Sequence, residues 1–344
     1  MRDRTILVTG GAGFIGSHFI EYIANHDTDC RIIVLDALTY AGQLENTPDE
    51  IRNSSRFEFW QGDVRNDALV NDLVQKSDVV VHFAAESHVS RSIYNDRVFF
   101  ETNVLGTQTV ANAVVRHIDR IDRFIHISTS EVYGTGTEIP MREEHPMNPS
   151  SPYGSSKAGG DRLVYSYWVT YGIPAVIVRP FNNYGPRQHL EKAIPRFITR
   201  AIKDEPITIH GDGIATRDWL YVKDHCEALY KLLDADLSGE FGQSINIGTG
   251  RETSVIDIAK SIVGILGKPE SLITYVPERP GQVNRHMASY EKINKLINWT
   301  PSTSIEEGLR HTVDWYITHQ DWWKALEWLA VVPVRTSDGT IELH

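Results

Sequence analysis

Cysteine, clustered positive charge and long apolar runs are all scarce in this chain of 344 residues. Its two cysteines, Cys30 and Cys226, lie far apart, which argues against a disulfide framework or a zinc site and suits a reducing, cytoplasmic compartment. The net charge is -11 at pH 7 with no basic stripe, so no nucleic-acid partner is expected. No apolar run could span a bilayer, and no histidine or carboxylate cluster has metal-ligand spacing, so neither membrane nor metal is predicted.

Short apolar runs alternate with helical stretches through the first half of the chain. Because they begin almost at the first residue, no signal peptide is expected. Strands are predicted at 5–10, 31–36, 56–64, 79–85, 123–129 and 175–180, and helices at 14–25, 67–76, 102–117 and 153–172. Near-continuous apolar strands alternating with helices indicate a doubly wound parallel α/β sheet of the Rossmann type.

The pattern changes after about residue 180 to shorter, mixed strands and helices. We therefore predict a nucleotide-binding domain over 1–180 and a smaller mixed α/β substrate lobe over 181–344. The seam between them is expected to form the substrate cleft, because ligand pockets favour such interfaces. The tail at 324–344 has no interpretation beyond packing or subunit contact.

A glycine-rich turn, TGGAGFIG, follows the first predicted strand and opens the first helix. Gly10, Gly13 and Gly16 would permit the tight turn and the close approach of the backbone to a pyrophosphate at the helix N-terminus. Asp36 ends the second strand 20 residues later, where a carboxylate accepts ribose hydroxyls and repels a 2′-phosphate. The predicted cofactor is therefore NAD rather than NADP.

Three hydroxyl side chains, Ser128, Thr129 and Ser130, and the Glu131 carboxylate follow the strand at 123–127, in the segment STSEVYG. Tyr153 and Lys157 lie four residues apart on the long predicted helix, so they share one helical face. A nearby ammonium lowers the pKa of a phenol, which would let Tyr153 act as a base toward a sugar hydroxyl.

Together these motifs resemble the extended short-chain dehydrogenase/reductase superfamily, whose members act on nucleotide sugars. Longer segments narrow the resemblance to the nucleotide-diphosphate-glucose 4,6-dehydratases, over about residues 3–323. They are LDALTYAG, FAAESHVSRSI, ETNVLGT, NNYGP with EKAIP, RDWLYVKDH, and HTVDWY with WW.

The resemblance implies a mechanism. Tyr153 would take the proton of the sugar 4-hydroxyl while NAD takes the C4 hydride, with Thr129 hydrogen-bonded to that oxygen. Glu131 would remove the C5 proton, and the hydride would return to C6 after water is lost. The family uses an aspartate to protonate the departing 6-hydroxyl, whereas this chain has Ser130. A serine hydroxyl is too weak an acid to replace a carboxylic acid directly, and losing a general acid typically costs about 10²–10⁴-fold in rate.

Other functions therefore stay open. The TSEVYG segment also looks like that of UDP-glucuronate decarboxylases, which need no acid at C6 because carbon dioxide leaves by itself. A 4-epimerase is less favoured because it does not need Glu131. A non-catalytic NAD-binding regulator is disfavoured because Thr129, Tyr153 and Lys157 are all present.

The resemblance also assigns binding residues and implies a homodimer formed through the helices near 103–117 and 153–172. The cofactor residues would be Gly10, Gly13, Phe14, Ile15, Gly16, Asp36, Leu38, Thr39, Asp63, Val64, Phe83, Ala84, Ala85, Thr102, Tyr153, Lys157 and Asn183. The substrate residues would be Ser87, Thr129, Asn182, Lys192, Arg217, Asn246 and Arg285. A second departure is Gln282, which stands where the dehydratases usually have histidine.

Overall fold

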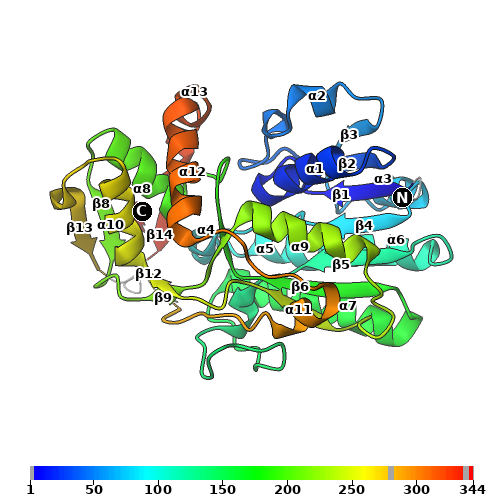
Figure 1. Ribbon diagram of the computed structural model, residues 1–344. Coiled ribbons are helices and arrows are strands. Elements are labelled where there is room, and N and C mark those ends of the chain that lie inside the picture. The colour runs from blue at the N-terminus through cyan, green and yellow to red at the C-terminus, as the bar shows by residue number, and fades with distance from the viewer. Residues whose placement is uncertain (1–3, 278–282, 336–340, 344) are drawn as a thin grey trace.

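The computed structural model describes residues 4–277, 283–335 and 341–343. A seven-stranded parallel sheet has the order β11-β6-β5-β4-β1-β2-β3, and Figure 1 shows it beside a smaller lobe. The strands are β1 (Thr5–Thr9), β2 (Arg31–Asp36), β3 (Phe57–Gln61), β4 (Val79–His82), β5 (Arg123–Ile127), β6 (Ala175–Pro180) and β11 (Ser244–Ile247). The predicted Rossmann-type sheet is confirmed.

Helices cover both faces of this sheet, which explains why its inner strands are largely apolar and buried, whereas the edge strand β3 is only partly buried. One face packs against α1 (Phe14–His26), α9 (Val222–Asp234) and α11 (Glu291–Ile297). The other packs against α3 (Asp67–Gln75), α6 (Thr107–Arg116) and α7 (Pro152–Tyr171). The strands pair in parallel register, so their carboxyl ends meet at one edge.

The smaller lobe has its own core, with Trp323 and Tyr316 fully buried. Its helices are α8 (Ala193–Ile202), α10 (Val255–Ile265), α12 (Ile305–Thr318) and α13 (Gln320–Lys324). Its strands pair as β8 (Ile207–His210) with β13 (Ile273–Val276), and β9 (Thr216–Arg217) with β12 (Thr253–Ser254). Between the lobes β7 (Asn182–Tyr184) pairs with β10 (Trp219–Tyr221), and the tail forms β14 (Pro333–Arg335) with β15 (Ile341–Leu343).

The predicted boundary at residue 180 needs a correction. β11 lies later in the chain but pairs with β6, placing Ser244 beside Ile177. α9 likewise packs against α1 in the first lobe. The later half of the chain therefore supplies an edge strand and a covering helix to the first lobe.

The predicted helix at 102–117 is longer and less regular than expected. It runs from α5 (Arg97–Phe100) through a π-helical segment, Glu101–Gly106, into α6. Such π-segments are frequent at functional sites, and this one carries Thr102. The remaining short helices are α2 (Asp49–Arg52) and α4 (Val89–Tyr94), with 3₁₀ turns at Leu44–Asn46, Ser130–Tyr133, Glu270–Leu272 and Glu327–Leu329.

Two negative findings apply to the described ranges. None of their helices combines the length and apolarity needed to cross a membrane. They also hold no group of three or more histidine, cysteine or carboxylate residues that could bind a metal ion.

Candidate active site

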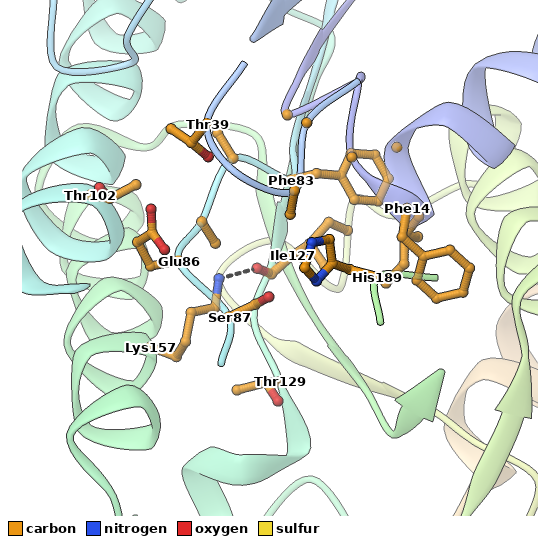
Figure 2. Close-up of a pocket in the computed structure, with 18 of the residues that line it drawn as sticks. Phe14, Thr39, Phe83, Glu86, Ser87, Thr102, Ile127, Thr129, Lys157 and His189 are labelled. Atoms are coloured by element: carbon orange, nitrogen blue, oxygen red, sulfur yellow. Dashed lines mark hydrogen bonds between the residues drawn. The ribbon is translucent and has the colours of Figure 1, made fainter. Parts of the chain in front are cut away.

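A cavity of about 360 Å³ opens at the carboxyl edge of the sheet. Figure 2 shows residues from several elements that line it, among them Phe14, Phe83, Thr129 and Lys157. All the predicted cofactor residues except Leu38 line this cavity. Leu38 lies beside it with a positive φ of 50°, and its backbone N–H donates to Asp36 Oδ1.

The glycine-rich turn leaves no space for side chains at two positions. Gly10 has a φ of 71°, and a Cβ there would lie 2.6 Å from the backbone nitrogen of Ala84. A Cβ on Gly16 would lie 2.4 Å from the carbonyl oxygen of Gly10. The turn therefore brings backbone against backbone at the start of α1, which leaves helix N–H groups available to an anion.

Asp36 stands at the cavity wall with its carboxylate held by the backbone. Oδ2 accepts from the Ala12 N–H at 2.9 Å, and Oδ1 accepts from the Leu38 N–H at 2.8 Å. Each oxygen keeps a second lone pair that could accept a ribose hydroxyl. These residues fit a dinucleotide with a free 2′-hydroxyl.

The predicted reactive side chains meet at the opposite end of the cavity. Thr129 and Glu131 follow β5, while Tyr153 and Lys157 come from the first turns of α7. Thr129 Oγ1 accepts the Glu131 N–H at 3.2 Å and so caps the 3₁₀ turn. Lys157 Nζ donates to the Ile127 carbonyl oxygen at 2.5 Å (Figure 2).

Burial dominates the electrostatics of these two side chains. It raises the pKa of the Tyr153 hydroxyl above its usual value, which hydrogen bonding with Thr129 partly offsets. Burial lowers the pKa of the Lys157 ammonium to about 8, while the Asp161 carboxylate raises it. The expectation that Tyr153 has a lowered pKa is therefore wrong for the chain by itself, because desolvation of the phenolate outweighs the favourable contacts.

A buried ion pair links the segments that carry these side chains. Arg179 on β6 binds Asp161 on α7 through two nitrogens, at 2.8 Å and 3.0 Å. Asp161 also accepts the Ser128 hydroxyl at 3.0 Å, and Arg179 donates to the Tyr133 hydroxyl at 2.9 Å. Both ends of the STSEVYG segment are thus fixed to the helix that carries Tyr153 and Lys157.

A second cavity of about 210 Å³ continues into the smaller lobe. Its lining residues come from both lobes, and it shares Glu131, Asn182 and Lys192 with the first cavity. Arg217, predicted to hold the sugar nucleotide, lines this second cavity. Ser87 lines the first, and its carbonyl accepts from Lys192 Nζ at 2.6 Å.

Besides Leu38, three predicted site residues line neither of the two cavities. Asn246 is fully buried, where its Oδ1 accepts the Tyr133 hydroxyl at 2.8 Å, so its side chain supports the core and cannot reach a ligand. Arg285 is paired with Glu252 at 2.8 Å on the surface. Ser130 is buried and lines neither described cavity, while Gln282 lies outside the described residues.

Sequence reasoning missed several residues that the structure brings to the site. Glu86, His189 and Glu191 line the first cavity. Asn103, on the π-helical segment, accepts the Glu86 N–H at 2.9 Å and donates to Ser156 at 2.9 Å. Asp161 could have been predicted to lie near Lys157, because residues four positions apart share one face of a helix.

The fold and site define an extended short-chain dehydrogenase/reductase with a dinucleotide cavity and an adjoining substrate cavity. The family model described as GDP-mannose 4,6 dehydratase matches residues 7–312. The chain therefore belongs to this family.

Named relatives agree with this assignment. The chain is 44% identical to the low-salt glycan biosynthesis protein Agl12 of Haloferax volcanii, over 91% of this chain and 98% of that protein. It is 40% identical to a dTDP-glucose 4,6-dehydratase of Actinoplanes, over 92% and 99%. The solved structure of DesIV, a dTDP-glucose 4,6-dehydratase from Streptomyces venezuelae with NAD and TYD bound, has a TM-score of 0.89 and 39% identity, covering 94% of this chain and 100% of that one. These matches support an NAD-dependent nucleotide-sugar 4,6-dehydratase.

NAD binding should depend on pH, because Lys157, a predicted cofactor residue, titrates in an accessible pH range. Lys157 is charged below a pKa of about 8 and neutral above it, so NAD affinity should fall as pH rises through about 8. Asp161→Asn removes the charge that raises this pKa, so the midpoint should move down by about one pH unit. Titration calorimetry with NAD between pH 6 and 9.5 measures the midpoint.

Two further variants separate the effect of charge on Lys157 from a loss of stability. Asp161→Asn leaves Arg179 buried without its ion-pair partner, so the double variant Asp161→Asn/Arg179→Met should show the same lower midpoint with less loss of stability. Asp67→Asn, which breaks a surface pair with Arg116, should leave the midpoint unchanged. A wild-type midpoint in a folded Asp161 variant contradicts the prediction.

Proposed function

We propose that this enzyme converts a nucleotide-diphosphate hexose such as dTDP-glucose or UDP-glucose into the 4-keto-6-deoxy sugar, with NAD regenerated in each cycle. One observation carries the proposal: Glu131 lines both cavities, beside Thr129 and Tyr153. A base for a carbon-bound proton is what dehydration requires beyond oxidation at C4.

The glycine-rich turn and Asp36 would hold the cofactor. A pyrophosphate fits the start of α1, where side chains are excluded, and a ribose fits against the Asp36 carboxylate. NAD bound there would accept a hydride from C4 of the sugar and return it to C6.

Thr129, Tyr153 and Lys157 would act on the 4-hydroxyl. Thr129 would orient the sugar oxygen, and Tyr153 would remove its proton. Because burial disfavours the phenolate, Tyr153 depends on positive charge nearby, which Lys157 supplies one helical turn away. Once C4 is a ketone, the C5 proton is acidic and Glu131 would remove it.

A decarboxylase is the second candidate, and the position of Ser130 favours it. Ser130 lines neither described cavity, so it places no acid against C6. A 4-keto uronic acid would need none, because the carboxylate leaves as carbon dioxide.

Incubation with NAD and a panel of substrates should separate the two candidates. The panel is dTDP-glucose, UDP-glucose, UDP-N-acetylglucosamine and UDP-glucuronate, followed by mass spectrometry of the products. We expect loss of one water from a neutral hexose nucleotide. Loss of carbon dioxide from the glucuronate alone would make the enzyme a decarboxylase, and no mass change with any of them would favour an epimerase.

We also propose a cytoplasmic homodimer. Both cysteines are free and buried, which suits a reducing compartment, and fractionation of cells expressing a tagged chain tests the location. The outer faces of the π-helical segment and α7 lie side by side and expose apolar residues: Leu105 is 52% exposed and Val169 60%. Apolar residues exposed on these two neighbouring elements would be buried in a dimer formed through them.

Charging that face should separate the subunits. Leu105→Glu/Val169→Glu should elute as a monomer in size-exclusion chromatography with light scattering, because buried unpaired carboxylates oppose association. Tyr275→Glu, on an exposed strand of the smaller lobe, should leave the dimer intact. A wild-type chain of monomeric mass contradicts the proposal.

A further inference from the structure

A buried histidine, His286, contacts both ends of the turn that carries Glu131. His286 lies beside β9, because its backbone N–H donates to the carbonyl oxygen of Thr216 at 3.3 Å. Its side chain is fully buried and packs edge-on against the ring of Phe181, with ring centroids 5.9 Å apart. Nothing in the proposed chemistry so far uses this residue.

Each ring nitrogen of His286 contacts one end of the turn. Nε2 lies 2.6 Å from the carbonyl oxygen of Gly134, and Nδ1 lies 3.5 Å from the hydroxyl oxygen of Ser130. A carbonyl can only accept, so Nε2 carries a proton. The protonation state of Nδ1 then decides what Ser130 can do.

In neutral His286, Nδ1 has a lone pair and accepts the Ser130 hydroxyl, so the serine proton points away from the cavities. In the imidazolium form Nδ1–H donates to the serine oxygen instead. The serine proton is then free to be given to another acceptor. Protonation of His286 therefore changes the acceptor of the Ser130 proton. In the neutral form the acceptor is His286, and in the imidazolium form it is a group on the substrate side.

Side chains from three separate segments affect the pKa of His286. Burial lowers its pKa, the Glu131 carboxylate on the 3₁₀ turn raises it, and Arg217 on β9 and His145 lower it. A diphosphate bound beside Arg217 would offset the positive charge of that guanidinium. Substrate binding should thus favour the imidazolium.

We propose that His286 and Ser130 together supply the proton for loss of the C6 hydroxyl, with His286 as the source and Ser130 as the relay. The inference rests on the proposed dehydratase function. It also explains how the enzyme can eliminate water although the usual acidic side chain is absent beside Glu131.

Glu131 takes the C5 proton, the C5 electron pair forms the C5–C6 double bond, and the C6–O bond breaks. The departing oxygen takes a proton from one bridging water, because Ser130 is not at the cavity wall. That water takes the Ser130 proton, Ser130 takes the Nδ1 proton of His286, and His286 is left neutral.

The test follows water loss and C4 oxidation separately in single-turnover experiments from pH 5 to 9, using the substrate that the panel selects. In the wild type, water loss should speed up as pH falls toward the pKa of His286. His286→Gln keeps a donor for Gly134 but does not titrate. It should abolish this rise and slow water loss by about 100-fold, with C4 oxidation within a factor of two.

Further variants isolate the relay from folding effects. Ser130→Ala should remove the same pH dependence without touching the histidine. Ser130→Asp in the His286→Gln background should restore water loss, because it returns a carboxylic acid to the turn. His145→Gln, a buried histidine whose Nε2 accepts from the Thr137 N–H, should keep the rise in water loss and move it to higher pH, because it removes a group that lowers the pKa of His286.

Different outcomes test the proton relay and the proposed dehydratase function. Wild-type rate and pH dependence of water loss in folded His286→Gln and Ser130→Ala would overturn the relay and leave the dehydratase intact. Absence of C4 oxidation by the wild type on every sugar nucleotide would instead overturn the proposed function, and the relay with it.

Discussion

The buried pair between Asp161 and Arg179 is the interaction on which the arrangement of the active site depends. It joins α7, which carries Tyr153 and Lys157, to β6 and to both ends of the turn after β5. Removing one partner of such a pair typically costs about 3–5 kcal/mol, because a charge is left buried. The pair therefore fixes the geometry between two chemical groups that lie more than twenty residues apart in sequence. Burial lowers the pKa of Lys157, and the Asp161 carboxylate of the pair partly offsets this lowering.

A second buried carboxylate connects the cofactor side of the cavity to the smaller lobe. Glu191 accepts the Tyr40 hydroxyl at 3.0 Å and Arg91 Nε at 2.6 Å, and the Arg91 guanidinium lies over the Tyr40 ring at 4.1 Å. Arg91 also donates to the Leu329 carbonyl, so the loop after β2, α4, the smaller lobe and the C-terminal segment meet here. Both carboxylates hold separate segments around the same continuous cavity.

Local patterns predicted the parts of the site that are local in sequence. The glycine turn, Asp36 and the Tyr153–Lys157 pair could be placed because each depends on spacing within one strand, turn or helix. Asn246 and Arg285 could not, because whether a side chain faces a cavity, the core or solvent depends on partners such as Tyr133 and Glu252 from distant segments. The same holds for His286, whose partners Ser130 and Gly134 are about 150 residues away.

The proposed function requires one hydride to leave C4 and to return to C6 of the same sugar while Glu131 acts at C5. The most direct measurement uses the selected sugar nucleotide with deuterium at C4, turned over with catalytic NAD, and locates the label in the product by NMR. The proposed function predicts deuterium in the C6 methyl group and no net reduction of NAD. Deuterium that stays at C4 in a product of unchanged sugar composition would contradict it and indicate an epimerase.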